Sequence, residues 1–369
     1  MHRHMWRFAI ALAASAASLS ASAQPAAPTA ITAKAGKPWL HKATGIALPA
    51  TIDGFARGEI LDLSNGPQLD VSIAYDDPIG RTHVNIYIYH AAAPSTALWF
   101  DVAATMIATN DKLGTITPHS APIPFAIPGA SAPAGLRQSF AITKVSRSSG
   151  VALIGLGEWV VKLRMTSPVY DSAQLDAAMD RMMQQVGWPK KLPPLATATP
   201  LAPCTQPRSF GPPAEKAKQD DAAMLLGAMM GSLVTDNSRK TRKKGEAPSA
   251  PALCVLSDRI GGRLPIYQGE GENAGYVIPL GDSGILLDVS QDSLAGLLTP
   301  EKDKDASPAP WSVTIKRLDR WLQYPSYATL PPPNQAIEIF QKEKPLSATS
   351  IYGKGGTQIS ISPDAMKKD

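Results

Sequence analysis

Ser283 has the sequence neighbours most suggestive of a nucleophile, in the string Gly281-Asp282-Ser283-Gly284. A serine nucleophile needs a histidine base within hydrogen-bond reach and a third group that orients this base. The string lies between two expected strands, where glycine, aspartate and serine favour a tight turn. We therefore predict a turn, and a serine hydrolase that uses Ser283 is the alternative.

Three other patterns carry chemically capable residues, and each favours a structural interpretation. The glycines at 269, 271 and 275 are followed by a β-like run, whereas a phosphate cradle needs a helix there. Asp76-Asp77 would bind calcium only with further oxygen ligands, and its position before Pro78 is typical of a turn. The histidines are scattered, and the two on one expected strand should face opposite sides of the sheet; they are His41, His83, His90 and His119. We predict no catalytic, metal-binding or cofactor-binding residue, and no cofactor.

The two cysteines, Cys204 and Cys254, are an even pair. In an exported protein such a pair predicts a disulfide, with two buried free thiols as the alternative. A bridge across a loop of about fifty residues would stabilise the fold by about 4 kcal/mol in the chain-entropy description.

The N-terminus has the three parts of a signal peptide. Met1–Arg7 is basic, residues 8–20 are apolar or small, and Ala21-Ser22-Ala23 supplies small residues for cleavage after Ala23. The apolar run is shorter than the ~20 residues needed to span a bilayer, which argues against a retained anchor. Cleavage removes two arginines and no acid, so the formal net charge falls from +5 to +3, too balanced to indicate a nucleic-acid partner. We expect a protein of the periplasm or a secreted protein, without a later transmembrane helix.

A central segment, residues 189–251, interrupts the globular pattern. It reads as a proline-rich linker with a helix over about 214–234, whose second half is almost wholly apolar. The segment contains a small-x-x-x-small pattern at Gly227 and Gly231, and a basic run follows it. Together they indicate a possible interaction site, made up of Gly227, Met229, Met230, Gly231, Arg239, Lys240, Arg242, Lys243 and Lys244. Such a helix packs on its own protein, pairs with an unknown protein or envelope component, or contacts anionic lipid through residues 222–244, as a peripheral membrane protein would.

Residues 40–188 are expected to form an α+β domain after a mobile tail at 24–39. The predicted order is three strands, a helix, three strands and a helix; the strands are Phe55–Leu63, Leu69–Tyr75, Thr82–His90, Phe140–Val145, Val151–Leu156 and Trp159–Thr166. Ser95 caps the first helix, and Asp171 with Gln174 forms a capping box on the second. A proline-rich loop spans 111–137. Lys162 and Arg164 should face solvent from the last strand, with contact to an acidic partner as the alternative.

This layout resembles a known family in the order of its elements. The entry Thr44-Gly45-Ile46-Ala47-Leu48-Pro49, the three-strand meander and the closing strand Lys162-Leu163-Arg164-Met165-Thr166 before a terminal helix are similar to the Mog1/PsbP-like α/β/α sandwich. The resemblance covers about residues 40–188. It implies a non-enzymatic accessory role, and it supplies no site residues.

Residues 252–369 read as a smaller β-rich domain. Its strand candidates are Leu253–Leu256, Gly275–Leu280, Ile285–Val289, Ala336–Phe340 and Gln358–Ser362, while Trp311–Leu322 could be a strand or a short helix. The overall prediction is an α+β protein with an antiparallel sheet packed by helices, followed by this β-rich domain. The function that it favours is a non-catalytic periplasmic or envelope binding or accessory protein whose ligand the sequence does not identify.

Overall fold

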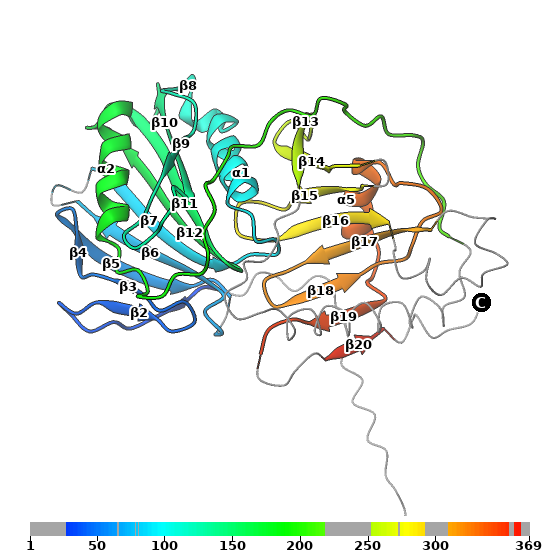
Figure 1. Ribbon diagram of the computed structural model, residues 1–369, viewed down its shortest axis with the longest axis horizontal. Coiled ribbons are helices and arrows are strands. Elements are labelled where there is room, and N and C mark those ends of the chain that lie inside the picture. The colour runs from blue at the N-terminus through cyan, green and yellow to red at the C-terminus, as the bar shows by residue number, and fades with distance from the viewer. Residues whose placement is uncertain are drawn as a thin grey trace, which may run out of the picture.

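Two antiparallel sheets make up the protein in the computed structural model (Figure 1). The structure describes residues 27–217, 252–291 and 309–362, except 65, 78, 80, 272, 273 and 354–357. A ten-stranded sheet packed with two helices comes first, and an eight-stranded sheet forms a separate domain after it. This arrangement confirms the predicted α+β class and the β-rich second part.

The large sheet has the strand order β1-β5-β6-β7-β12-β11-β10-β8, with β4 beside β5 and β9 beside β10. Its strands are β1 (Thr29–Ala30), β4 (Thr51–Ile52), β5 (Phe55–Asp62), β6 (Asp70–Asp76), β7 (His83–His90), β8 (Ile116–Pro118), β9 (Ile123–Phe125), β10 (Gly135–Ile142), β11 (Ser148–Leu156) and β12 (Trp159–Ser167). A separate pair, β2 (Trp39–His41) and β3 (Ile46–Leu48), lies before β4. All six expected strands of this part are present, although β10 begins and ends earlier than predicted.

Two segments of the first part are more ordered than the sequence indicated. The expected loop 111–137 contains the 3₁₀ helix η1 (Asp111–Leu113), β8 and β9, and the start of β10. Within the expected mobile tail, β1 pairs with β5. Both are short edge additions, and their few residues leave too little hydrophobic periodicity for a sequence pattern.

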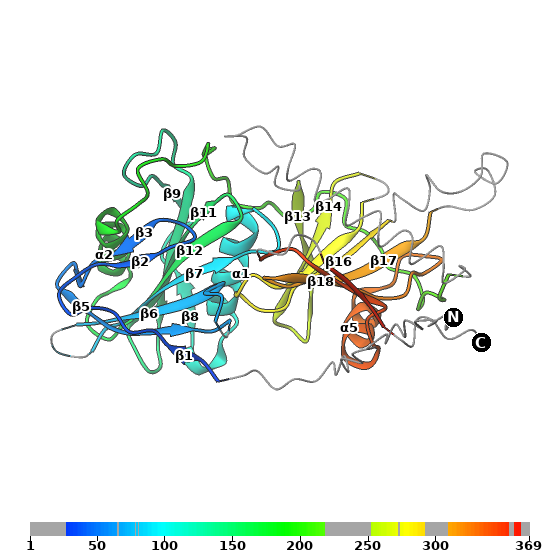
Figure 2. The ribbon, with the colours of Figure 1, turned by 90° about the horizontal axis from the view of Figure 1, so that it is seen from below.

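One helix covers each face of the large sheet. Helix α1 (Thr96–Ala108) begins at Ser95, whose side chain accepts a hydrogen bond from the backbone of Leu98. Helix α2 (Ser172–Gln185) begins at Asp171, which forms the predicted capping box with Gln174. The buried side chains of α2 share a core with those that β7 places on one face, including Ile86, and α1 packs on the opposite face. Figures 1 and 2 show α1 between the large sheet and the second sheet.

The second sheet is a meander, because each of its strands pairs with the next one along the chain. Its strands are β13 (Leu253–Ile260), β14 (Leu264–Gly269), β15 (Tyr276–Pro279), β16 (Leu286–Gln291), β17 (Trp311–Lys316), β18 (Arg320–Gln323), β19 (Ser347–Ser350) and β20 (Ile359–Ile361). The ambiguous stretch 311–322 forms two strands, β17 and most of β18. The predicted strand Ala336–Phe340 is wrong, because these residues belong to helix α5 (Pro333–Lys342).

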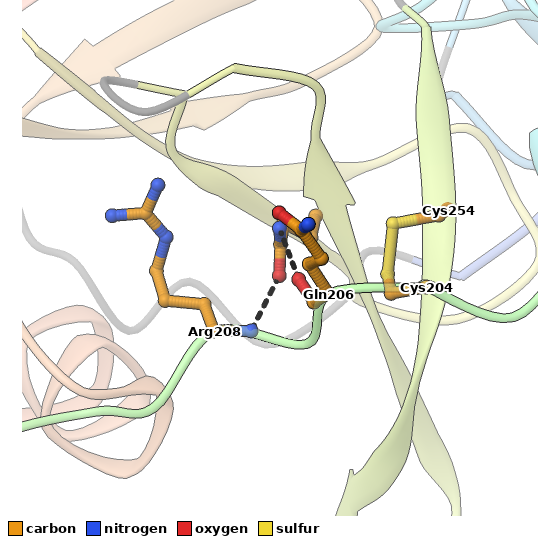
Figure 3. The surroundings of a disulfide bond; sticks show 5 residues. Cys204, Gln206, Arg208 and Cys254 are labelled. Carbon is orange, nitrogen blue, oxygen red and sulfur yellow. Dashed lines mark hydrogen bonds between the residues drawn. A yellow bond between two sulfur atoms is a disulfide. The ribbon is translucent and has the colours of Figure 1, made fainter.

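Residues 189–217 run as an extended strap from the large sheet onto the second one. The backbone N–H of Ala198 donates to Pro133 in the first part, and that of Cys204 donates to Val255 on β13. Cys204 and Cys254 form the predicted disulfide, with a Cα–Cα distance of 4.8 Å (Figure 3).

Beyond the disulfide, the strap keeps its contact with the second sheet. The backbone of Arg208 donates to Gln268, whose side chain donates in turn to the carbonyl of Gln206 (Figure 3). The backbone of Lys216 forms an isolated antiparallel β-bridge with Tyr327, so the strap is still extended where the helix 214–234 was expected to begin. The rest of that helix and the basic run, with the possible interaction residues Gly227 to Lys244, lie outside the described residues.

Candidate functional site

A polar area lies on the α1 face of the large sheet, beside the helix. Helix α1 packs over β10 and β11, where the side chains are apolar. On β6, β7 and β12 the same face carries polar side chains in direct register: Ser72 lies opposite Tyr87, and Tyr87 lies opposite Lys162. We call this area the polar face and define it by six residues: Asp70, Ser72, Asn85, Tyr87, Lys162 and Arg164.

The second domain covers part of the polar face with the turn Gly281–Gly284. The ammonium Nζ of Lys162 donates to the carboxylate Oδ2 of Asp282 at 2.7 Å and to its backbone oxygen at 2.9 Å. Lys162 also lies 4.5 Å from the ring centroid of Tyr87, close enough for a cation–π contact. The side chain of Lys162 is 5% exposed and that of Asp282 is 38% exposed, so the cation is fully enclosed and well satisfied.

Asp70 is a buried acid in the same cluster. Burial raises the pKa of its carboxyl to about 6; the ammonium of Lys162 opposes this rise, and the carboxylate of Asp282 adds to it. Among the described residues none donates a hydrogen bond to this carboxylate. Asp70 therefore changes its charge close to neutral pH, which is characteristic of residues at functional sites.

Tyr89 and Arg164 are polar groups of this region that the described chain leaves without hydrogen-bond partners. The hydroxyl of Tyr89 is buried and unpaired within the described residues. Burial lowers the pKa of the Arg164 guanidinium to about 10, against the raising effects of Asp282 and Tyr87. Arg164 is half-buried, and the half-buried Asn85 lies directly opposite it on β7. Neither Arg164 nor Asn85 makes a hydrogen bond through its side chain within the described chain.

The turn sits on the polar face because several further contacts join the two parts. The backbone N–H of Ala92 donates to Gly284 at 2.9 Å, and the ring Nδ1 of His90 lies 2.6 Å from the carbonyl of Leu318. Tyr267 donates to Asp101 on α1 at 2.7 Å. Three side chains of the second sheet complete the hydrophobic core around α1: Tyr267, Val277 and Leu286.

The structure shows where the predicted candidate residues lie. Ser283 is in a turn between β15 and β16, as expected, and its neighbour Asp282 pairs with Lys162 instead of a histidine. Both ring nitrogens of His41 and of His90 already have polar neighbours. The carboxylate of Asp77 accepts three backbone N–H groups, which fits the predicted turn. Within the described chain, no group of three potential ligands could hold a metal ion.

One prediction on this face is wrong. Lys162 and Arg164 were expected on a solvated strand face, but Lys162 is buried and Arg164 is half-buried. Strand alternation placed them correctly on one face, and the second domain then covered part of it. The sequence signal for the missed residues is weak: Asp70 and Tyr89 are single polar residues on strands, with no motif around them.

No protein-family model, curated protein or solved structure matches this chain. Across the parts of the chain that the structure describes, no helix has the length and apolar character needed to span a membrane.

Proposed function

We propose that this protein is a non-catalytic binding or accessory protein of the bacterial cell envelope, exported to the periplasm or secreted. The observation that carries the proposal is the polar face, where Arg164 and Asn85 keep unused hydrogen-bonding groups beside the well-satisfied pair of Lys162 and Asp282. Polar groups withdrawn from water are normally hydrogen-bonded, so the unused donors of these two half-buried side chains suit a ligand. The disulfide fits an oxidising compartment and supports the proposed export.

The polar face favours binding over catalysis. A nucleophilic serine needs a base, and no histidine of the described chain hydrogen-bonds to Ser283. In a catalytic arrangement an acid would orient the base, but the carboxylate of Asp282 is already paired with Lys162. The peripheral-membrane alternative depends on residues 222–244, and its support is the apolar and basic pattern of their sequence.

We further propose that the first domain is a Mog1/PsbP-like sandwich. The support is the element order, together with one helix on each face of an antiparallel sheet. An accessory role without a catalytic set agrees with that assignment.

The proposed function is tested by filling the polar face. Ala74 lies opposite Asn85 on β6, and a tyrosine there would cover the face with a residue that suits a strand. Ala141 is an exposed alanine on β10 and serves as the matched control. Immobilised wild type and Ala141→Tyr should retain the same molecules from envelope extract, and Ala74→Tyr should lose them. Equal retention by all three proteins would contradict binding at this face.

A further inference from the structure

We propose that Arg164 and Asn85 together form a binding site for a carboxylate group of the ligand. This inference rests on the proposed binding function and names the chemistry that the polar face recognises. The ligand would be a small carboxylic acid or a peptide that presents a carboxylate.

The two side chains are placed by the strand register. Arg164 on β12 lies directly opposite Asn85 on β7, and Asn85 lies opposite Ala74 on β6. Directly opposed residues on one face of an antiparallel pair have Cβ atoms about 4.5–5.5 Å apart, so one ligand group can contact both. Gly58 on β5 lies beside Ala74, because a Cβ on Gly58 would lie 3.6 Å from the Ala74 Cβ; the carboxylate Oδ2 of Asp76 lies 2.7 Å from the same position. Ala74 therefore places no large side chain directly opposite Asn85, and the Asp76 carboxylate borders the Gly58 end of the row.

The chemistry of the pair favours an anion. The Arg164 guanidinium is partly desolvated, and a desolvated cation without an acceptor is costly. Asp282, the acid whose charge acts on Arg164, already has one oxygen engaged by Lys162 at 2.7 Å. A planar guanidinium matches the two oxygens of a carboxylate in a bidentate arrangement, and the Asn85 amide adds one or two donors.

The surrounding charges favour a carboxylate over a phosphate. Lys162 and Asp282 cancel each other, and above about pH 6 the Asp70 carboxylate offsets the charge of Arg164, so the polar face has little net positive charge with which to hold a multiply charged anion. A phosphate carries more charge at neutral pH than a carboxylate, so Asp282 would repel it more strongly. It also presents more acceptor oxygens than this pair of side chains can satisfy.

The site is tested by NMR titration of the full mature protein with sodium acetate, and with sodium phosphate at matched ionic strength. The probes are the Nε–H of Arg164 and the side-chain amide of Asn85. Arg137, which is already paired with Asp176 and Asp180, is the internal reference. Acetate should shift both probes saturably in the millimolar range and leave Arg137 unchanged.

The variants separate the carboxylate site from non-specific charge effects. Arg164→Gln should weaken acetate binding about tenfold, because it removes the charge and the bidentate donors. Arg164→Lys should have an intermediate affinity, and Arg81→Gln, at an exposed turn, should bind as wild type does.

Two results would overturn the carboxylate site. One is the absence of a saturable shift with acetate, and the other is tighter saturation with phosphate. If either occurs while Ala74→Tyr still abolishes capture from extract, the polar face binds something other than a carboxylate. If capture is insensitive to Ala74→Tyr as well, the proposed function itself is wrong.

Discussion

Replacing Asp70 with asparagine should stabilise the protein at neutral pH. Asp70 is 7% exposed, and burial raises the pKa of its carboxyl from the model-compound value of 3.8 to about 6. Each pKa unit corresponds to about 1.4 kcal/mol, so the ionised form costs about 3 kcal/mol of folding free energy. Asparagine is nearly the same size and carries no charge, so it should recover most of this amount.

The sign of the effect fixes its pH dependence. The folded state holds the proton on Asp70 more tightly than the unfolded state does. Below the unfolded pKa both states are protonated and there is no cost. As the pH rises from about 4 to about 6, the unfolded chain loses its proton first, and the folded protein loses stability relative to it. The gain from Asp70→Asn should therefore be small near pH 4 and approach its full size about one pH unit above the folded pKa.

Urea denaturation at a series of pH values from about 4 to about 8 measures this difference in unfolding free energy. Asp77→Asn is a control of opposite sign: desolvation is the largest single effect on the Asp77 carboxyl and raises its pKa, but three backbone N–H groups and the Thr82 side chain together lower the pKa below its usual value. Its replacement should destabilise the protein at neutral pH, with less effect in acid. A gain for Asp70→Asn that does not depend on pH, or a loss at pH 7, would refute the reasoning.

Three further predictions test the contacts that hold the fold. Replacing Cys204 and Cys254 with serine should cost about 4 kcal/mol of unfolding free energy, and thiol titration of the denatured, unreduced wild type should find no free thiol. Asp282→Asn should lower the unfolding free energy by about 3 kcal/mol, because it leaves the buried ammonium of Lys162 without its charged partner. The control Asp111→Asn removes an exposed ion pair that also joins the two parts, and it should lower the unfolding free energy by less than about 1 kcal/mol. Equal losses of stability in thermal melts would contradict the role of burial. Asp171→Ala should cost about 1 kcal/mol through the lost cap of α2, and a variant as stable as wild type in urea would show that the cap adds nothing.

The sequence predicts elements well where a single strong pattern specifies them. In β7, apolar and polar side chains alternate, and the apolar ones are buried in the core that α2 shares. In α2, the capping box of Asp171 and Gln174 marks the start of the helix, and the apolar stripe follows at helical spacing. Both patterns are local, so no information from elsewhere in the chain is needed.

Helix α5 shows how a short pattern misleads. Ile337 and Ile339 flank Glu338, which reads as the alternation of a strand over five residues. The ten-residue helix buries Ala336 and Ile339, three positions apart, as helical spacing requires. Pro333 at the start of the helix was the signal in favour of a helix, because proline suits the first turn.

The polar face could be predicted only in part. Strand alternation puts Lys162 and Arg164 on one face, and that much is evident from the sequence. Whether the face is solvated depends on a turn far along the chain, around Asp282, and on the hydrophobic contacts that bring the second sheet against α1. No local pattern encodes such a contact, and so the raised pKa of Asp70 and the unpaired hydroxyl of Tyr89 were not predictable.

The meander of the second sheet also bears on how the chain folds. Because β13 to β20 pair only with their sequence neighbours, each new strand can add to an existing edge, through short connections except between β16 and β17 and between β18 and β19. The large sheet is different: β7 must wait for β12, with α1, β8, β9, β10 and β11 between them. We therefore expect the C-terminal sheet to acquire hydrogen-exchange protection first, and the closure of β7 on β12 to limit the rate at which the whole protein folds.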